Sequence, residues 1–185
     1  PLIILEERSV GPDLGADSVN AGKIAAIIGF SAVIIFMIIV YRRFGFFADV
    51  ALIINLIMVL GVLSLLQATL TLPGIAGLIL TIGMAVDANV LIFSRIREEL
   101  NSGKKPFEAI VAGYDRAFIT IWDANLTTFL VAIILYSFGT GPIKGFAVTL
   151  SIGILTSMFT SIMGTRALVT LIYGKRKNLQ RVAIG

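Results

Sequence analysis

The sequence predicts an all-α membrane protein: a bundle of five transmembrane helices that follows a short remnant of a soluble domain. Hydrophobic residues make up 57% of the 185 residues and charged residues only 14%, whereas soluble domains are about 25% charged. The apolar residues are gathered into runs of about 20, which is the length that crosses a bilayer as a helix. Composition and run length together place most of the chain in a membrane.

The first 20 residues differ from the rest. Residues 1–10 combine an apolar run with charges, which is typical of the last strand of a soluble domain. Gly11 and Pro12 then interrupt the chain, and Asp17 and Ser18 suit the N-cap of a helix. We therefore expect the end of an extracytoplasmic domain and its linker, with the remainder of that domain missing from this piece.

Five crossings are predicted between residues 21 and 174. They cover residues 23–41, 49–66, 73–93, 117–138 and 143–173. Pro73 suits the first turn of the third helix. Pro106 opens a short amphipathic helix in the loop 95–116, which we expect to lie on the membrane surface rather than to bind a partner helix. Residues 175–185 are expected to form a cytoplasmic tail.

The distribution of positive charges predicts which ends of the helices face the cytoplasm. Eleven Lys and Arg residues fall on one side of the predicted helices and three on the other, and the side with the excess is normally cytoplasmic. They are Arg42, Arg43, Arg95, Arg97, Lys104, Lys105, Arg116, Lys175, Arg176, Lys177 and Arg181, against Arg8, Lys23 and Lys144. The net charge of +4 is therefore attributed to loops that set orientation and not to nucleic-acid binding. Arg166 is expected near the inner headgroups, reaching toward water.

Two predicted helices carry the same polar tripeptide. Asp87-Ala88-Asn89 lies in the third and Asp123-Ala124-Asn125 in the fourth. Because these helices run in opposite directions, both acids should lie at a similar level, in the cytoplasmic half. A carboxylate at that depth costs several kcal/mol unless it has a partner, a proton or water.

The acids have two interpretations. Asp87 is either a protonated carboxyl that donates a hydrogen bond, or a site that binds and releases a proton, and intramembrane acids favour the second. For Asp123 both interpretations stay open, since it could also tether the loop. Thr120 and Thr127 share a helix face with Asp123.

Other polar residues have structural interpretations. Asn55, Asn89 and Asn125 are expected to form hydrogen bonds between helices. Asp49 and Asp115 lie at predicted helix ends and are expected to be solvated. Small and hydroxyl residues form a stripe on the fifth helix that predicts close helix packing: Gly153, Ser157, Thr160, Ser161 and Gly164.

Enzymatic chemistry is not predicted. The chain has no cysteine and no histidine, which excludes disulfides, thiolate metal sites and imidazole proton relays. No phosphate-binding loop or nucleophile–base set is present, since the glycine-rich stretches lie in apolar helices. We expect no catalytic residue, no cofactor and no metal.

Four runs resemble the SecD/SecF family of protein-export membrane proteins, within the resistance-nodulation-division superfamily. They are LTLPGIAGLILTIGMAVDANVLIFSRIREEL, VGPDLGADSVNAG, TIWDANLTT and GTGPIKGFAVTLSIGILTSMFTSIMGTRALVTLIYG. Together they reach from about Glu6 to Gly174, in the family's order. Ser94 departs from the pattern, where a charged residue is expected.

The resemblance implies a fold and a function. The family pairs a SecD half with a homologous SecF half, each with six helices and a large periplasmic domain, and this chain would be helices two to six of the SecD half in a bacterial inner membrane. The implied partners are SecF, the SecYEG translocon, the unfolded exported polypeptide and the lipid bilayer. The pair uses the proton-motive force to assist export, and the family's proton-linked aspartate falls on Asp87. Asp123 also belongs to the family pattern.

Two alternatives remain. The chain could be a passive scaffold of the translocase without ion coupling, with Asp87 as a hydrogen-bonding strut. It could also be a small-molecule exporter of the same superfamily. Such exporters often carry two adjacent acids at this place, whereas Asp87 is followed by Ala88.

Overall fold

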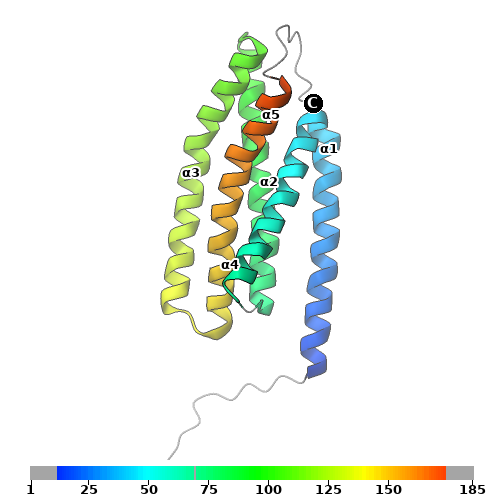
Figure 1. Ribbon diagram of the computed structural model, residues 1–185, viewed down its shortest axis with the longest axis vertical. Helices are drawn as coiled ribbons and strands as arrows, with labels where there is room; N and C mark the ends of the chain where they lie inside the picture. Colours follow the sequence, from blue (N-terminus) through cyan, green and yellow to red (C-terminus); the bar gives the residue numbers. More distant parts are fainter. Residues whose placement is uncertain (1–11, 69, 174–185) are drawn as a thin grey trace, which may run out of the picture.

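The computed structural model describes residues 12–68 and 70–173, and all regular secondary structure in this part of the chain is helical. Its elements are α1 (Pro12–Leu65), α2 (Leu72–Asn101), α3 (Pro106–Phe138), α4 (Gly141–Met158), the π-helical segment η1 (Phe159–Gly164) and α5 (Thr165–Tyr173) (Figure 1). Four helical stretches of this part are long and apolar enough to cross a membrane. The predicted strand in residues 1–10 and the tail 175–185 lie outside the described residues.

The helix α1 reverses direction at Arg42. This residue has φ 50° and ψ −116°, which no helix contains. Figure 1 shows the two parts of α1 folded back on each other, the first in blue and the second in cyan. At Gly45 an added Cβ would overlap the carbonyl of Met37, so the returning chain passes directly against the first part. The prediction of an N-cap at Asp17 or Ser18 is wrong, since the helix already begins at Pro12.

The helix α3 is longer than predicted. It runs without interruption from Pro106 to Phe138, so the amphipathic segment forms its first turns and is not a separate helix on the membrane surface. Ile110 and Tyr114 are buried there against the bundle. The apolar face of this segment is thus covered by the chain itself rather than by lipid headgroups.

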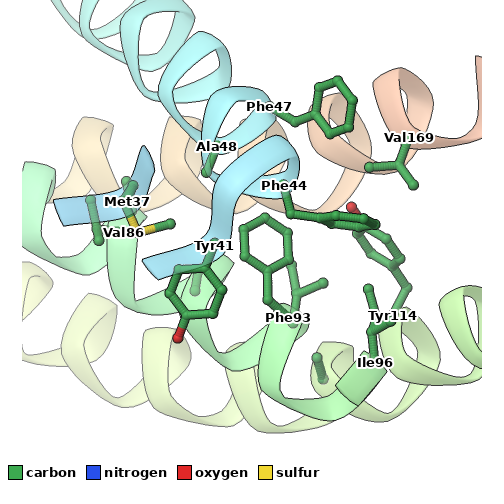
Figure 2. Packing of buried hydrophobic residues seen from close by; sticks show 14 of the residues in the cluster. Met37, Tyr41, Phe44, Phe47, Ala48, Val86, Phe93, Ile96, Tyr114 and Val169 are labelled. Atoms are coloured by element: carbon green, nitrogen blue, oxygen red, sulfur yellow. The ribbon is translucent and has the colours of Figure 1, made fainter. Parts of the chain in front are cut away.

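An aromatic cluster fixes the end of the bundle at which α1 reverses (Figure 2). Phe44 is fully buried, and its ring centroid lies 5.3 Å from that of Phe93 on α2 and 5.6 Å from that of Tyr173 on α5. Tyr41 packs on Phe93 at the same ring distance of 5.3 Å. Because rings of both parts of α1 contact α2, the reversal is held in place by side-chain packing.

The stripe of small residues lies at a helix interface, as predicted. An added Cβ at the buried Gly153 would overlap the side chain of Thr81, so α4 and α2 approach closely at this point. Ser157, Thr160 and Ser161 are also buried, and their hydroxyls donate to backbone carbonyls of their own helix. Small residues thus allow α2 and α4 to pack without a large side chain between them.

Candidate functional site

Asp87 lies in an open groove between α2 and α3. Its side chain is exposed on the surface of the described chain. The groove has a volume of about 210 Å³. Polar groups in its lining come from Asp87, Thr120, Asn125 and Thr128, and the other lining residues are Met84, Ala88, Leu91, Ile121 and Ala124. The site is therefore a carboxyl at the edge of an otherwise mostly apolar groove.

The carboxyl of Asp87 has no partner within the described chain. Among residues 12–68 and 70–173, no side chain donates a hydrogen bond to it or pairs with it. Thr128 in the same groove donates to the carbonyl of Ala124 at 3.1 Å. An exposed carboxyl without an internal partner is accessible to water and to a group from outside this chain.

The two Asp-Ala-Asn tripeptides do not have equivalent positions. The groove is lined by Asp87 of the first, and by Ala124 and Asn125 of the second, so the two segments lie side by side. Asp123 is exposed but does not line the groove. Of the two acids, only Asp87 faces this space.

The polar neighbours bond within their own helices. Asn89 donates to Ala85 at 3.0 Å, Asn125 donates to Ile121 at 2.8 Å, and Thr127 donates to the carbonyl of Asp123 at 3.0 Å. The buried side-chain oxygens of Asn55 and Asn89 have no hydrogen-bond partner. The predicted hydrogen bonds between helices are therefore wrong for Asn89 and Asn125, since their amide groups satisfy a carbonyl one turn earlier.

Asp49 is buried, although it was expected to be solvated. Its exposed fraction is 5%, and neither carboxyl oxygen has a hydrogen-bond partner. The reversal at Arg42 explains the error, because α1 is helical again before Asp49 and carries it into the bundle beside the buried Ala48 and Leu52. The sequence predicts a break between the first two crossings at residues 42–48, but it does not show that the helix resumes early enough to bury Asp49.

Replacing Asp49 with Leu is expected to raise the stability of the protein by roughly 1–3 kcal/mol, because two buried oxygens without partners are removed. Thermal unfolding of the detergent-solubilised protein measures the effect. Asp17 is exposed near the start of α1, so Asp17→Leu is the control and should change stability by less than about 0.5 kcal/mol. A lower unfolding temperature for Asp49→Leu would show that the carboxyl has a stabilising partner.

Ion pairs gather at the end of the bundle where α2 turns into α3. Glu99 lies 2.6 Å from Lys104 and 2.6 Å from Arg116. Arg166 pairs with Asp115 at 3.1 Å. Asp115 is thus inside α3 and paired, not at a helix end, and Arg166 has a protein partner. The ion pairs of Glu99 connect the end of α2 with the turn that follows it and with α3.

Comparison with known proteins supports a protein-export role for relatives of this chain. The family model "Protein export membrane protein SecD/SecF, C-terminal" matches residues 2–175. The protein translocase subunit SecD of Magnetococcus marinus is 57% identical over 177 residues, covering 96% of this chain and 34% of that protein. SecD of Rickettsia bellii is 60% identical over 171 residues, covering 92% of this chain and 33% of that protein.

Two solved structures of SecDF are similar to this chain in fold. The crystal structure of SecDF from Thermus thermophilus, described as a translocon-associated membrane protein, has a TM-score of 0.85 and 43% sequence identity. The match covers 91% of this chain and 24% of that chain. SecDF in a super-membrane-facing form has a TM-score of 0.81 at 45% identity, covering 88% and 22%. The chain therefore spans about a third of the curated relatives and about a quarter of the SecDF chain.

Proposed function

Because this chain belongs to the SecD/SecF C-terminal family and corresponds to the C-terminal region of SecD proteins, we propose that it is the membrane part of a subunit that uses the proton-motive force to assist protein export. The observation that carries the proposal is the position of Asp87. Its carboxyl lines an open groove and has no partner in the described chain. A proton can reach such a group and leave it again.

The proposed topology has five crossings, helices two to six of a SecD half. The stretch Asp17–Leu65 contains 49 residues, about 74 Å of helix at 1.5 Å per residue, which is enough for two crossings joined at Arg42. The excess of Lys and Arg at one end assigns that end to the cytoplasm. The N-terminal end then faces the periplasm of a bacterial inner membrane.

The proposed partners follow from the relatives. The SecDF structure is of a translocon-associated protein, so the SecYEG channel is the proposed site of action and the exported polypeptide the substrate. A homologous SecF half is the proposed cover for the groove, because the side of α2 and α3 that carries Asp87 is open in this chain. A group from that half would then complete the surroundings of the carboxyl.

The proposal is tested with proteoliposomes that contain the full-length protein, its partner half and the channel. Export of a secretory protein is measured with a proton gradient and after an ionophore has collapsed it. The increase in export that depends on this subunit should disappear with the gradient. If the increase in export survives collapse of the proton gradient, the scaffold alternative is supported. If the gradient instead drives efflux of a small molecule and has no effect on protein export, the exporter alternative is supported.

A further inference from the structure

The reversal of α1 presents two arginines to the surface. Arg42 and Arg43 are both exposed, and no described residue forms a hydrogen bond or ion pair with either guanidinium. Two other arginines at this end of the bundle differ, since Arg95 pairs with Glu98 at 2.7 Å and Arg116 pairs with Glu99. Two adjacent positive charges at this turn are thus left without acidic partners in the described chain.

Arg43 also lines a groove whose other walls are apolar. The groove has a volume of about 190 Å³ and lies between the returning part of α1 and the end of α5. Its remaining lining residues are Phe46, Phe47, Ile172 and Tyr173. The ring of Tyr173 contacts that of Phe47 with centroids 6.3 Å apart, so part of the wall is rigid. Phe46 and Ile172 remain 59% and 43% exposed and can meet a hydrocarbon chain.

The position of this groove along the bundle matches the level of lipid headgroups. The reversal of α1 lies at the same end of the bundle as the α2–α3 turn, where Glu99 pairs with Lys104 (Figure 1). Basic residues are enriched next to the ends of membrane-spanning helices, at the level of the headgroups. A ligand at this place meets a cation on the water side and apolar walls on the hydrocarbon side.

We propose that this groove binds an anionic phospholipid, with Arg43 holding the phosphate and Phe46 and Ile172 contacting an acyl chain. A guanidinium forms two parallel hydrogen bonds to a phosphate. A zwitterionic lipid also offers a phosphate, but its ammonium group cancels that charge, so it would leave the net positive charge of Arg42 and Arg43 uncompensated. The site is separate from the groove of Asp87, and its existence does not depend on proton coupling.

The test counts lipids retained by the protein. The full-length protein is reconstituted with palmitoyl-oleoyl phosphatidylglycerol and phosphatidylcholine, extracted in mild detergent and examined by native mass spectrometry. Wild type should retain one phosphatidylglycerol in preference to phosphatidylcholine. Arg43→Gln should lower that retention about tenfold, the loss of one charge-assisted contact, while Arg43→Lys should keep part of it.

The matched control is Lys105→Gln, which removes one positive charge from the same end of the bundle but does not line the groove. It should leave lipid retention unchanged. An equal loss in Arg43→Gln and Lys105→Gln would overturn the proposal, because it would show a general attraction to the basic end. Retention that rises after Lys175, Arg176 and Lys177 are replaced by Gln would also overturn it, because the chain's own tail would then be the occupant. Unchanged unfolding temperatures of all variants exclude misfolding as the cause.

Discussion

Replacing Asp87 with Asn is expected to reduce export in the reconstituted system to the level measured after the proton gradient is collapsed. Asn keeps the size of the side chain and can still form hydrogen bonds, but it cannot bind and release a proton. The groove position supports this expectation, since the carboxyl is exposed and no described residue compensates its charge. The measurement is the rate of export with and without an ionophore.

The proposed role requires that one carboxyl can bias a conformational step. Charging or neutralising a carboxyl in a medium of low dielectric changes the free energy by several kcal/mol. A difference of about 5.5 kcal/mol moves a two-state equilibrium from 1:99 to 99:1. If the proposed partner half covers the groove and excludes water, the proposed protonation of Asp87 would favour one packing of α2 and α3 against that half, and deprotonation would favour another.

The matched control for Asp87 is Asp123→Asn. It alters the same tripeptide on the neighbouring helix, but Asp123 does not line the groove. Export by this variant should keep most of its gradient dependence. If Asp87→Asn retains full gradient dependence while Asp87→Leu prevents assembly, Asp87 is a hydrogen-bonding strut and the proton role is excluded.

The sequence predicted the helical class of the described residues, because long apolar runs are a local signal. Runs of apolar residues predict membrane-length helices from composition alone. An acid inside such a run is conspicuous for the same reason, so Asp87 could be singled out without coordinates. That Asp87 lines the groove and Asp123 does not could not be predicted, since it depends on how α2 and α3 are rotated against each other.

The errors have a common origin in contacts between distant segments. Arg42 adopts a positive φ that is uncommon for residues other than glycine. The first predicted crossing ends at residue 41, but the next one starts only at residue 49. The burial of Asp49 follows from that reversal. The residue pattern after Pro106 predicts a helix on the membrane surface. In the structure, Gly113 allows this segment to lie directly against Ile96 of α2, so the segment is part of the bundle.

The close approach of α3 to α2 at Gly113 predicts a large loss of stability in Gly113→Ala. An added Cβ would lie 2.7 Å from the backbone nitrogen and 2.8 Å from the Cα of Ile96. Backbone atoms cannot turn aside as a flexible side chain can, so the two helices must separate. The overlap involves backbone atoms, so we expect the upper part of the usual overpacking cost, about 3 kcal/mol. After the gain of about 1 kcal/mol that alanine brings to a helix, a net loss of about 2 kcal/mol remains.

Gly61→Ala is the control that shows the effect of helix propensity on stability without a new packing contact. Gly61 is also inside a helix, but nothing lies within 4 Å of the position that a Cβ would take. This variant should keep or raise the unfolding temperature of the detergent-solubilised protein, whereas Gly113→Ala should lower it. Because both substitutions add the same methyl group to a helix, their difference measures the contact with Ile96. Equal unfolding temperatures for the two variants would mean that α2 and α3 do not touch at this level and that the turn between them is held by the ion pairs of Glu99 alone.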